Sequence, residues 1–510
     1  MLDVTRGRPP LRESRPRPHA VVIGSGFGGL AAAIRLGARG YRVTVLEKLD
    51  APGGRAYVYR QDGFTFDAGP TIVTAPFLFQ ELWSLCGRHL SDDVDLRPIS
   101  PFYRIRFDDG DVLDYSGDAT AMDREIARIA PDDVDGYRRF MKASEAIYRI
   151  GFERLGHASF DSWKSMAAIL PDLVRLQGYR TVHSFVAGFV RNAKLRIALS
   201  FHPLLIGGNP FTATSVYCLI SYLERAFGVH FAMGGTGRLI EGMVELIESQ
   251  GNVVRCGAEV SEITIRNGAA TGVRLSDGTS IPSDIVVSNA DSAWTYRHLV
   301  APDARRRWTD RRIERSRYSM SLFVWYFGTR RTYPEVPHHM LVLGPRYREL
   351  LRDIFRHKRL AEDFSLYLHR PTATDPSLAP PNCDAFYVLS PVPHLESGID
   401  WATAAEPYRK AIARRLQETV LPDLENNVVT SRLLTPQDFQ DRLSSFRGAA
   451  FGLEPVLWQS AWFRPHNKSE DVKNLFLVGA GTHPGAGLPG VLSSARVLDS
   501  VVPNASAYAR

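Results

Sequence analysis

The sequence predicts an α/β protein whose first domain is Rossmann-like and discontinuous, with a mixed α+β domain inserted into it. An apolar strand, a glycine-rich turn and an alanine-rich helix begin at His19. Strand-rich sequence returns in the middle of the chain, and a second glycine-rich turn, "GAGTHPGAGLPG", occupies residues 479–490. At 510 residues the chain is too long for one simple core, so two or more domains are expected.

The turn after the first strand matches the G-x-G-x-x-G pattern through Gly24, Gly26 and Gly29. We expect Gly24 to form the tight bend, Gly26 to let a pyrophosphate approach the backbone, and Gly29 to allow close packing of helix on strand. The N-terminus of that helix offers unpaired amides and a positive dipole end to phosphates. Glu47 ends the second strand, where an acidic side chain binds ribose hydroxyls. Together these features predict dinucleotide binding, whereas a turn that merely packs leaves Glu47 unexplained.

In a nicotinamide dehydrogenase, another strand–helix unit follows at this point. The sequence after Glu47 does not contain such a unit. It runs through Gly53, Gly54 and Arg55 into short strands and a further glycine turn at 69–71. An arginine beside two glycines can neutralise a pyrophosphate, whose charge the helix dipole offsets only in part. The alternative for Arg55 is a surface salt bridge.

Two later segments predict that the first domain resumes. Residues 234–263 predict an amphipathic helix with Thr236 as its N-cap, then a strand through Val260 and a meander that turns at Asp277. Residues 471–491 predict a strand, the second glycine-rich turn and a helix, which aims another helix N-terminus at a ligand. We therefore expect the two glycine-rich turns to hold one long cofactor, the first at its phosphates and the second at its redox ring.

Eight segments spread over nearly the whole chain carry a family resemblance: "GSGFGGLAAAIRL", "PGGRAYVY", "GFTFDAGPT", "SFHPLLIGGNPF", "GPRYREL", "AEDFSLYLH", "QSAWFRPHN" and "VGAGTHPGAGLPGV". With them the chain resembles, from His19 to about Val502, the bacterial-type phytoene desaturases of the carotenoid desaturase family, within the FAD-dependent amine-oxidase-like superfamily. The resemblance implies FAD as the cofactor. It implies as the activity the desaturation of phytoene in several successive steps, to neurosporene, lycopene or both.

The fold class is then a Rossmann-like FAD-binding domain in three parts, with an inserted substrate domain that includes a helical, membrane-associating region. Residues 1–18 are predicted to form a disordered tail. The FAD-binding domain is predicted to consist of 19–86, 228–292 and 468–510, and the substrate domain of 87–227 and 293–467. The membrane-associating helices are expected within 87–227.

The resemblance also implies which residues contact FAD. The AMP and pyrophosphate half is contacted by Gly24, Gly26, Gly29, Glu47 and Arg55, the adenine by the backbone of Val260, and the isoalloxazine by Gly69, Pro70, Thr71, Gly481, Thr482, Gly490 and Val491.

Phytoene is a hydrocarbon with no charge and no hydrogen-bonding group, so its recognition requires a long apolar channel. Four apolar, aromatic-rich segments either line such a channel or form ordinary core: "MAAILPDLVRL", "SFHPLLIGGNPF", "SMSLFVWYFG" and "FYVLSPVP".

The substrate lives in the bilayer, yet no apolar run reaches the roughly 18–20 residues that span one, and no signal peptide opens the chain. We therefore expect a cytoplasmic protein that docks on the membrane surface. The net charge is +7, but no nucleic-acid partner is expected. The docking candidate is a basic amphipathic helix over 346–360. The alternative is that this helix packs its apolar side on the core. A second basic run, 305–317, predicts a solvated face or a lipid site.

Desaturation removes a hydride and a proton from adjacent carbons, and FAD can accept the hydride. His483, in the second glycine-rich turn, is the candidate catalytic residue, and the alternative is a satisfied turn histidine. Further candidates are His202, Glu454 and His466. The four cysteines are widely spaced and show no metal-ligand cluster, so no metal site is expected. No second dinucleotide motif is present, so a quinone or dioxygen is the expected electron acceptor.

Two other functions fit the same sequence. A related carotenoid isomerase, or a desaturase of a substituted carotenoid, would share these motifs. A non-catalytic isoprenoid-binding escort protein would keep the fold without flavin chemistry. Glu47, Arg55 and the intact second turn favour a bound flavin over an escort.

Overall fold

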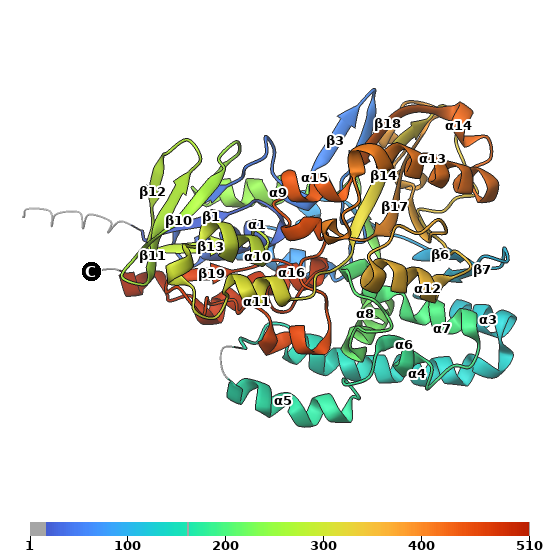
Figure 1. The fold of residues 1–510 in the computed structure, drawn as a ribbon, viewed down its shortest axis with the longest axis horizontal. Coiled ribbons are helices and arrows are strands. Elements are labelled where there is room, and N and C mark those ends of the chain that lie inside the picture. Colours follow the sequence, from blue (N-terminus) through green and yellow to red (C-terminus); the bar gives the residue numbers. More distant parts are fainter. Residues whose placement is uncertain (1–16, 161–162, 509–510) are drawn as a thin grey trace, which may run out of the picture.

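The structure is a computed structural model that describes residues 17–160 and 163–508. The tail predicted over 1–18 lies outside these residues except for Arg17 and Pro18. Figure 1 shows two sheet-containing halves side by side, with a layer of helices beneath the right half. No helix among the described residues combines the length and the apolar character needed to cross a bilayer.

The first sheet has five parallel strands that come from three distant parts of the chain. Their order is β19 (Leu475–Leu477), β13 (Ile285–Ser288), β1 (His19–Ile23), β2 (Arg42–Leu46) and β9 (Val253–Arg255). The central strand, β1, is buried along its whole length because layers cover both faces of the sheet. The strand order shows which segments of the chain share this sheet. The exact boundaries of the FAD-binding and substrate domains stay predictions.

One face of this sheet is covered by helices and the other by a small antiparallel sheet. The helices are α1 (Phe27–Ala38), α2 (Pro76–Leu85), α9 (Thr236–Ser249) and α16 (Leu488–Val501). The small sheet consists of β10 (Val260–Arg266), β11 (Ala269–Leu275) and β12 (Ser280–Pro282), with α10 (Ser292–Trp294) and α11 (Asp310–Arg315) beside it. The turn predicted at Asp277 is confirmed, since the Thr279 amide donates to the Asp277 carboxylate at 2.8 Å.

The N-terminus of α9 differs from the prediction. Thr236 is the first helical residue, and Gly235 occupies the N-cap position without a side chain to offer. The Asp67 carboxylate accepts from the Thr236 amide at 2.9 and 3.0 Å. The cap therefore comes from β4 (Phe64–Asp67), 169 residues earlier in the chain, which local sequence reasoning could not find.

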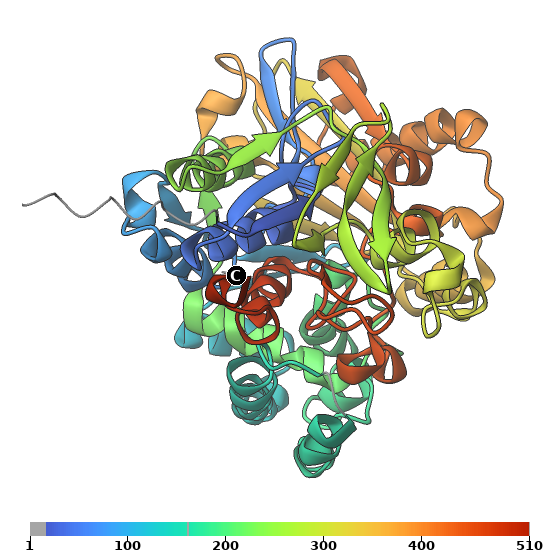
Figure 2. The same ribbon diagram turned by 90° about the vertical axis from the view of Figure 1, so that its left-hand side faces the viewer.

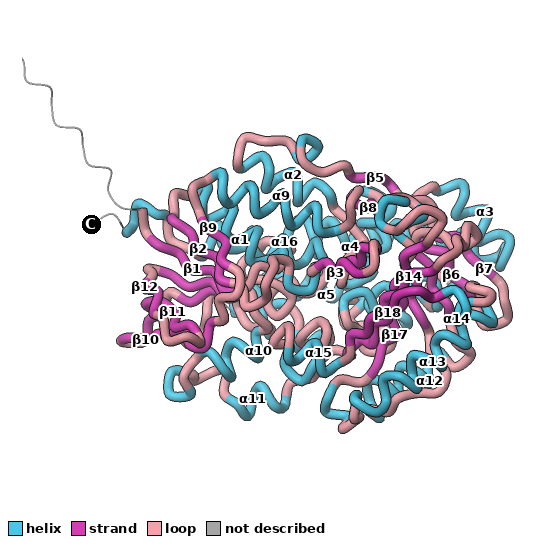
Figure 3. The backbone as a smooth tube through the Cα atoms, turned by 90° about the horizontal axis from the view of Figure 1, so that it is seen from above, coloured by secondary structure: helices cyan, strands magenta, loops and turns pink. Residues whose placement is uncertain are grey.

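The second sheet has seven strands and builds the right half of Figure 1. Their order is β18 (Val428–Leu434), β14 (Ser321–Thr329), β17 (Asp384–Val392), β16 (Leu366–His369), β15 (His339–Val342), β6 (Tyr103–Arg106) and β7 (Val112–Tyr115). Only the β15–β6 pair is parallel within this sheet of the described chain. Figure 3 shows the two large sheets at opposite ends of the molecule.

Strand β14 explains how one apolar segment serves two purposes. Because successive side chains point to opposite faces, Phe323 and Trp325 pack against helix α13 (Trp401–Thr419), whereas Leu322 and Val324 face the opposite side. Leu322 and Val324 also line the large cavity described below. The segment "SMSLFVWYFG" is therefore core on one face and cavity wall on the other.

A helical layer lies beneath the second sheet in Figures 1 and 2. It contains α3 (Ala119–Ile129), α4 (Val134–Tyr148), α5 (Trp163–Arg175), α6 (Val182–Val186), α7 (Ala193–Ser200) and α8 (Leu219–Phe227). Both figures show α5 at the outer edge of the molecule. The smaller elements include two strand pairs, β3 (Val58–Gln61) with β4 and β5 (Leu96–Pro98) with β8 (His230–Ala232), and helices α14 (Leu424–Asn427) and α15 (Pro436–Asp441).

The basic helix over 346–360 packs its apolar side on the core. It forms α12 (Tyr347–Arg352) and one wider turn over 353–357. Its apolar side packs into the core, where Tyr347, Leu350, Leu351 and Ile354 are all buried. The alternative of core packing is therefore correct, because the second sheet and the helical layer already cover the apolar stripe.

The basic run 305–317 is largely paired within the protein. The buried Arg305 forms an ion pair with Asp310 at 2.7 Å, and Arg307 pairs with Glu470 at 2.6 Å. The Arg312 guanidinium lies over the Trp308 ring. These contacts favour a partly buried ion-pair network over a lipid site.

Candidate active site

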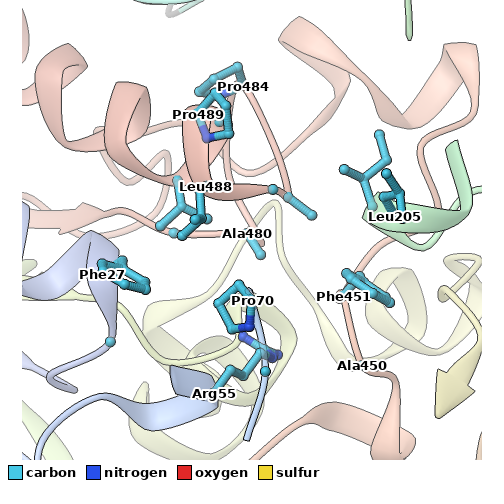
Figure 4. Close-up of a pocket in the computed structure, with 18 of the residues that line it drawn as sticks. Phe27, Arg55, Pro70, Leu205, Ala450, Phe451, Ala480, Pro484, Leu488 and Pro489 are labelled. Atoms are coloured by element: carbon cyan, nitrogen blue, oxygen red, sulfur yellow. The ribbon is translucent and has the colours of Figure 1, made fainter. Parts of the chain in front are cut away.

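A continuous cavity of about 570 Å³ connects the first sheet to the second. One end is lined by the first glycine-rich turn and Glu47, and the other by apolar side chains of the second sheet and the helical layer. Figure 4 shows its middle, where Phe27, Arg55 and Pro70 lie across from Ala480, Pro484 and Leu488. Both glycine-rich turns, more than 400 residues apart, thus border one space.

The first glycine-rich turn has the geometry that its glycines predict. Gly24 has a φ of +88°, which a side chain rarely adopts. A Cβ on Gly29 would lie 2.0 Å from the Gly24 carbonyl oxygen, so α1 can approach β1 only with glycine there. Gly24 and Gly26 line the cavity, and Gly29 lies behind them and packs. Gly26 and Phe27, at the N-terminus of α1, line the cavity, and no side chain caps this helix end.

Glu47 lies at the cavity end and also orders the turn. Its Oε2 accepts from the Ser25 amide at 2.9 Å and from the Ser25 hydroxyl at 2.7 Å, and its Oε1 accepts from the Leu49 amide at 3.0 Å. This structural role was not predicted. Val260 and Glu259 line the cavity beside Glu47, where an adenosine would lie.

Arg55 is enclosed by the protein, and its remaining free surface faces the cavity. One guanidinium nitrogen donates to the Ser445 hydroxyl at 3.1 Å, and Nε has no hydrogen-bond partner. No described carboxylate forms an ion pair with it. Desolvation lowers the pKa of Arg55, and the charge of Asp291 opposes this shift. The surface salt bridge is therefore excluded for the described residues. An unpaired guanidinium at a cavity wall fits an anionic pyrophosphate.

The second glycine-rich turn is only partly where the sequence placed it. Gly479, Ala480, His483, Gly490 and Val491 line the cavity. Gly481 and Thr482 do not belong to the wall. The Thr482 hydroxyl donates to the Pro465 carbonyl at 2.5 Å, and a Cβ on Gly481 would meet the Ser292 hydroxyl at 2.6 Å. These two residues fix the turn from behind, which the motif alone could not reveal.

The turn at 69–71 forms the opposite wall, and it brings polar groups that the sequence analysis missed. Thr71 shares a hydrogen bond of 2.6 Å with the Tyr387 hydroxyl and lies 3.5 Å from the Tyr367 hydroxyl. Tyr367 and Tyr387 line the cavity from neighbouring strands β16 and β17. Both lie in segments that the sequence marked, "AEDFSLYLH" and "FYVLSPVP", but neither tyrosine stood out within its segment.

Most of the remaining wall is apolar. It includes Ile147, Ile169, Leu173, Leu176, Leu204, Leu205, Val216, Leu219, Leu322, Val324, Leu341 and Leu343. All four segments that the sequence predicted as channel or core contribute to it, on α5, around residues 204–205, on β14 and on β17. Such a wall suits an elongated hydrocarbon, since no polar atom would be buried without a partner.

His483 faces the cavity as a neutral imidazole. Its Nε2 donates to the Leu155 carbonyl at 2.9 Å, so that Nδ1, which has no partner, is left as an acceptor. Burial lowers the pKa of His483 to about 4, and its ring packs on the edge of Phe160. The side chain therefore stays uncharged at neutral pH.

None of the three further candidates lines the cavity. Glu454 is ion-paired with Arg317 at 2.8 Å, and His466 contacts the Trp462 carbonyl at 2.9 Å. His202 lies 3.1 Å from Glu224, and Glu224 itself does reach the wall. No sequence motif points to Glu224, a single buried acid in helix α8.

Fold and site together define a flavin-dependent oxidoreductase, and the chain belongs to the family of flavin-containing amine oxidoreductases, which matches it over residues 27–497. FAD is the cofactor. Among curated proteins, the chain is 49% identical to phytoene desaturase (neurosporene-forming) of Cereibacter sphaeroides, over 98% of this chain and 97% of that protein. It is 48% identical to phytoene desaturase (lycopene-forming) of a Paracoccus species, over 95% and 97%.

Solved structures share the fold at low identity. A putrescine oxidase variant aligns over 97% of this chain and 98% of its own, with a TM-score of 0.65 at 12% identity. Cyclohexylamine oxidase from Brevibacterium oxydans aligns over 97% and 100%, with a TM-score of 0.59 at 14% identity.

Replacing Arg55 tests the cofactor end of the cavity. We expect Arg55→Gln to weaken FAD binding about tenfold to hundredfold, because hydrogen bonds to charged groups contribute roughly 1.5–3 kcal/mol. Arg60→Gln, which changes an exposed arginine on the neighbouring strand β3, is the control and should bind FAD normally. Equilibrium titration of the apoprotein with FAD measures both. Equal affinity in Arg55→Gln and wild type would contradict the assignment.

Proposed function

We propose that this chain catalyses the FAD-dependent desaturation of phytoene in several successive steps, to neurosporene, lycopene or both. The observation that carries the proposal is the single cavity, polar where it meets the first glycine-rich turn and apolar beyond the second. Relatives at 48–49% identity over nearly full length form neurosporene or lycopene, which supports phytoene as the substrate.

The chemistry is divided between cofactor and protein. Bound FAD supplies a hydride acceptor. The apolar wall, including Leu322 and Val324, holds the polyene by shape and keeps water away from it. Two residues of the cavity wall, His483 with its unpaired Nδ1 and Glu224 with its carboxylate, are acceptors that can take up the proton released from the adjacent carbon. The two electrons then pass to a quinone or dioxygen.

Glu224 is held in a defined position for such a task. Its Oε1 accepts from the Tyr103 hydroxyl at 2.7 Å, and its Oε2 lies 3.1 Å from His202 Nε2. The carboxylate is almost wholly buried, yet it borders the cavity. Both partners thus fix the side chain of this wall residue.

Membrane docking is proposed through helix α5 in place of 346–360. Leu170 and Val174, one turn apart, are 53% and 58% exposed, whereas Ile169 and Leu173 of the same helix line the cavity. One face of α5 thus meets the outside and the other meets the channel. Since phytoene dissolves only in the hydrocarbon of the bilayer, a helix with these two faces provides the shortest apolar route from membrane to cavity.

Pigment extraction tests the activity. In cells that make phytoene, expression of this chain should replace phytoene with coloured carotenes, whose identity by chromatography reports the number of steps. Unreacted phytoene beside well-folded, yellow protein would contradict the proposal. Conversion of a substituted carotenoid or isomerisation alone would instead favour a related carotenoid enzyme. Colourless protein that binds isoprenoid but no FAD would favour an escort.

Charging the outer face of α5 tests the docking surface. We expect Leu170→Asp/Val174→Asp to weaken binding to anionic liposomes, measured by cosedimentation, by about a hundredfold or more, because each of the two buried apolar side chains contributes roughly 1.5–3 kcal/mol. Val429→Asp, on the 46%-exposed Val429 of β18, is the matched control. Unchanged FAD content confirms folding. The docking surface would lie elsewhere if the control variant lost liposome binding, or if the α5 variant kept it.

A further inference from the structure

Three buried histidines meet behind the cavity wall, where the sequence predicted no metal site. His339 and His369 are directly opposite each other in the pairing of β15 with β16, so their side chains share one face of the sheet. His338 precedes β15, and its ring lies 4.5 Å from the ring of His339 and 4.8 Å from that of His369. Each of the three is at most 4% exposed.

The spacing of their nitrogens suits a shared ligand. One nitrogen from each ring can be chosen so that all three lie within 4.8 Å of one another. The Nδ1 atoms of His339 and His369 are 3.3 Å apart. Two nitrogens bound at about 2.0–2.1 Å to one tetrahedral ion are separated by about this distance.

The protein does not satisfy these rings by itself. Nε2 of His338, His339 and His369 is buried, and none of these atoms has a hydrogen-bond partner among the described residues. Buried polar atoms are nearly always paired, so three unpaired nitrogens in one cluster call for a ligand.

Neighbouring hydroxyls orient two of the rings. The Thr374 hydroxyl lies 2.6 Å from Nδ1 of His338, and the Tyr367 hydroxyl lies 2.7 Å from Nδ1 of His339. A hydrogen bond on Nδ1 fixes the orientation of a histidine that binds metal through Nε2, as His338 would. The Tyr367 hydroxyl instead lies beside the Nδ1 atom through which His339 would bind. Tyr367 also lines the cavity, so the cluster stands directly behind the wall.

The surroundings keep the imidazoles in their ligating form. Burial lowers the pKa of His338 to about 3, helped by Arg370, and it holds the pKa values of His339 and His369 well below the ordinary range. The charge of Arg370 is itself balanced by Asp384 at 3.3 Å. Neutral imidazole is the form that binds a metal ion.

We propose that His338, His339 and His369 bind one divalent transition-metal ion of the zinc class. Three imidazole nitrogens would complete three of four tetrahedral positions, and the fourth lies open to a water molecule or to the hydroxyl of Tyr367. The ion would tie β15 to β16 behind Tyr367 and hold that part of the cavity wall in place. The site is separate from FAD binding and does not depend on the identity of the substrate.

Metal analysis of the holoenzyme tests the site. Full-length protein without a polyhistidine tag is equilibrated with Zn²⁺, dialysed against metal-free buffer and measured by inductively coupled plasma mass spectrometry. We expect about one zinc per chain. His338→Ala and His369→Ala should each lower the Zn²⁺ affinity about tenfold or more. His394→Ala changes a buried histidine outside the cluster and should keep the zinc.

Each outcome decides the question. Wild-type protein that takes up less than about a tenth of an ion per chain overturns the proposal without any variant. Equal zinc in wild type, in both cluster variants and in the control would show binding elsewhere and would overturn it too. If His369→Ala does not fold, judged by its FAD content, the conservative His338→Gln variant takes its place.

Discussion

The enclosed guanidinium of Arg55 is the constraint on which the cofactor half of the molecule depends. A cation that faces a cavity without an ion-pair partner is unfavourable unless an anion arrives, because desolvation raises the free energy of its charge. The N-terminus of α1 adds positive potential to the same place. A diphosphate such as that of FAD would satisfy both at once.

The other half of the cavity follows from the opposite requirement. A hydrocarbon offers nothing to pair with, so its wall must contain few polar atoms that lack partners. Alternation along β14 meets this need while the same strand packs against α13. Among the polar residues of the wall, Thr71 hydrogen-bonds with both Tyr367 and Tyr387. One continuous space therefore changes from polar to apolar along its length.

Sequence reasoning found what depends on local geometry. Gly24, Gly26, Glu47 and Arg55 lie at the cavity because one continuous strand–turn–helix–strand and the loop after it bring them to the same edge of the sheet. The second turn was found as a segment, but Gly481 and Thr482 lie behind the wall because the order of residues does not say which backbone groups face inward.

What depends on long-range contacts was not predictable. An amphipathic stripe does not reveal what covers it, so the helix over 346–360 was equally compatible with a membrane and with the core that buries it. Asp67 caps a helix 169 residues away. His339 and His369 meet only through the register of two strands. Each of these required the fold.

Anaerobic mixing of the oxidised flavoprotein with phytoene in liposomes tests the central claim most directly, since it asks whether one cavity brings polyene and flavin together. The account predicts that the yellow absorbance of the flavin fades while a more conjugated carotene appears in equal amount. A flavin that stays oxidised while phytoene is bound to the protein would contradict it.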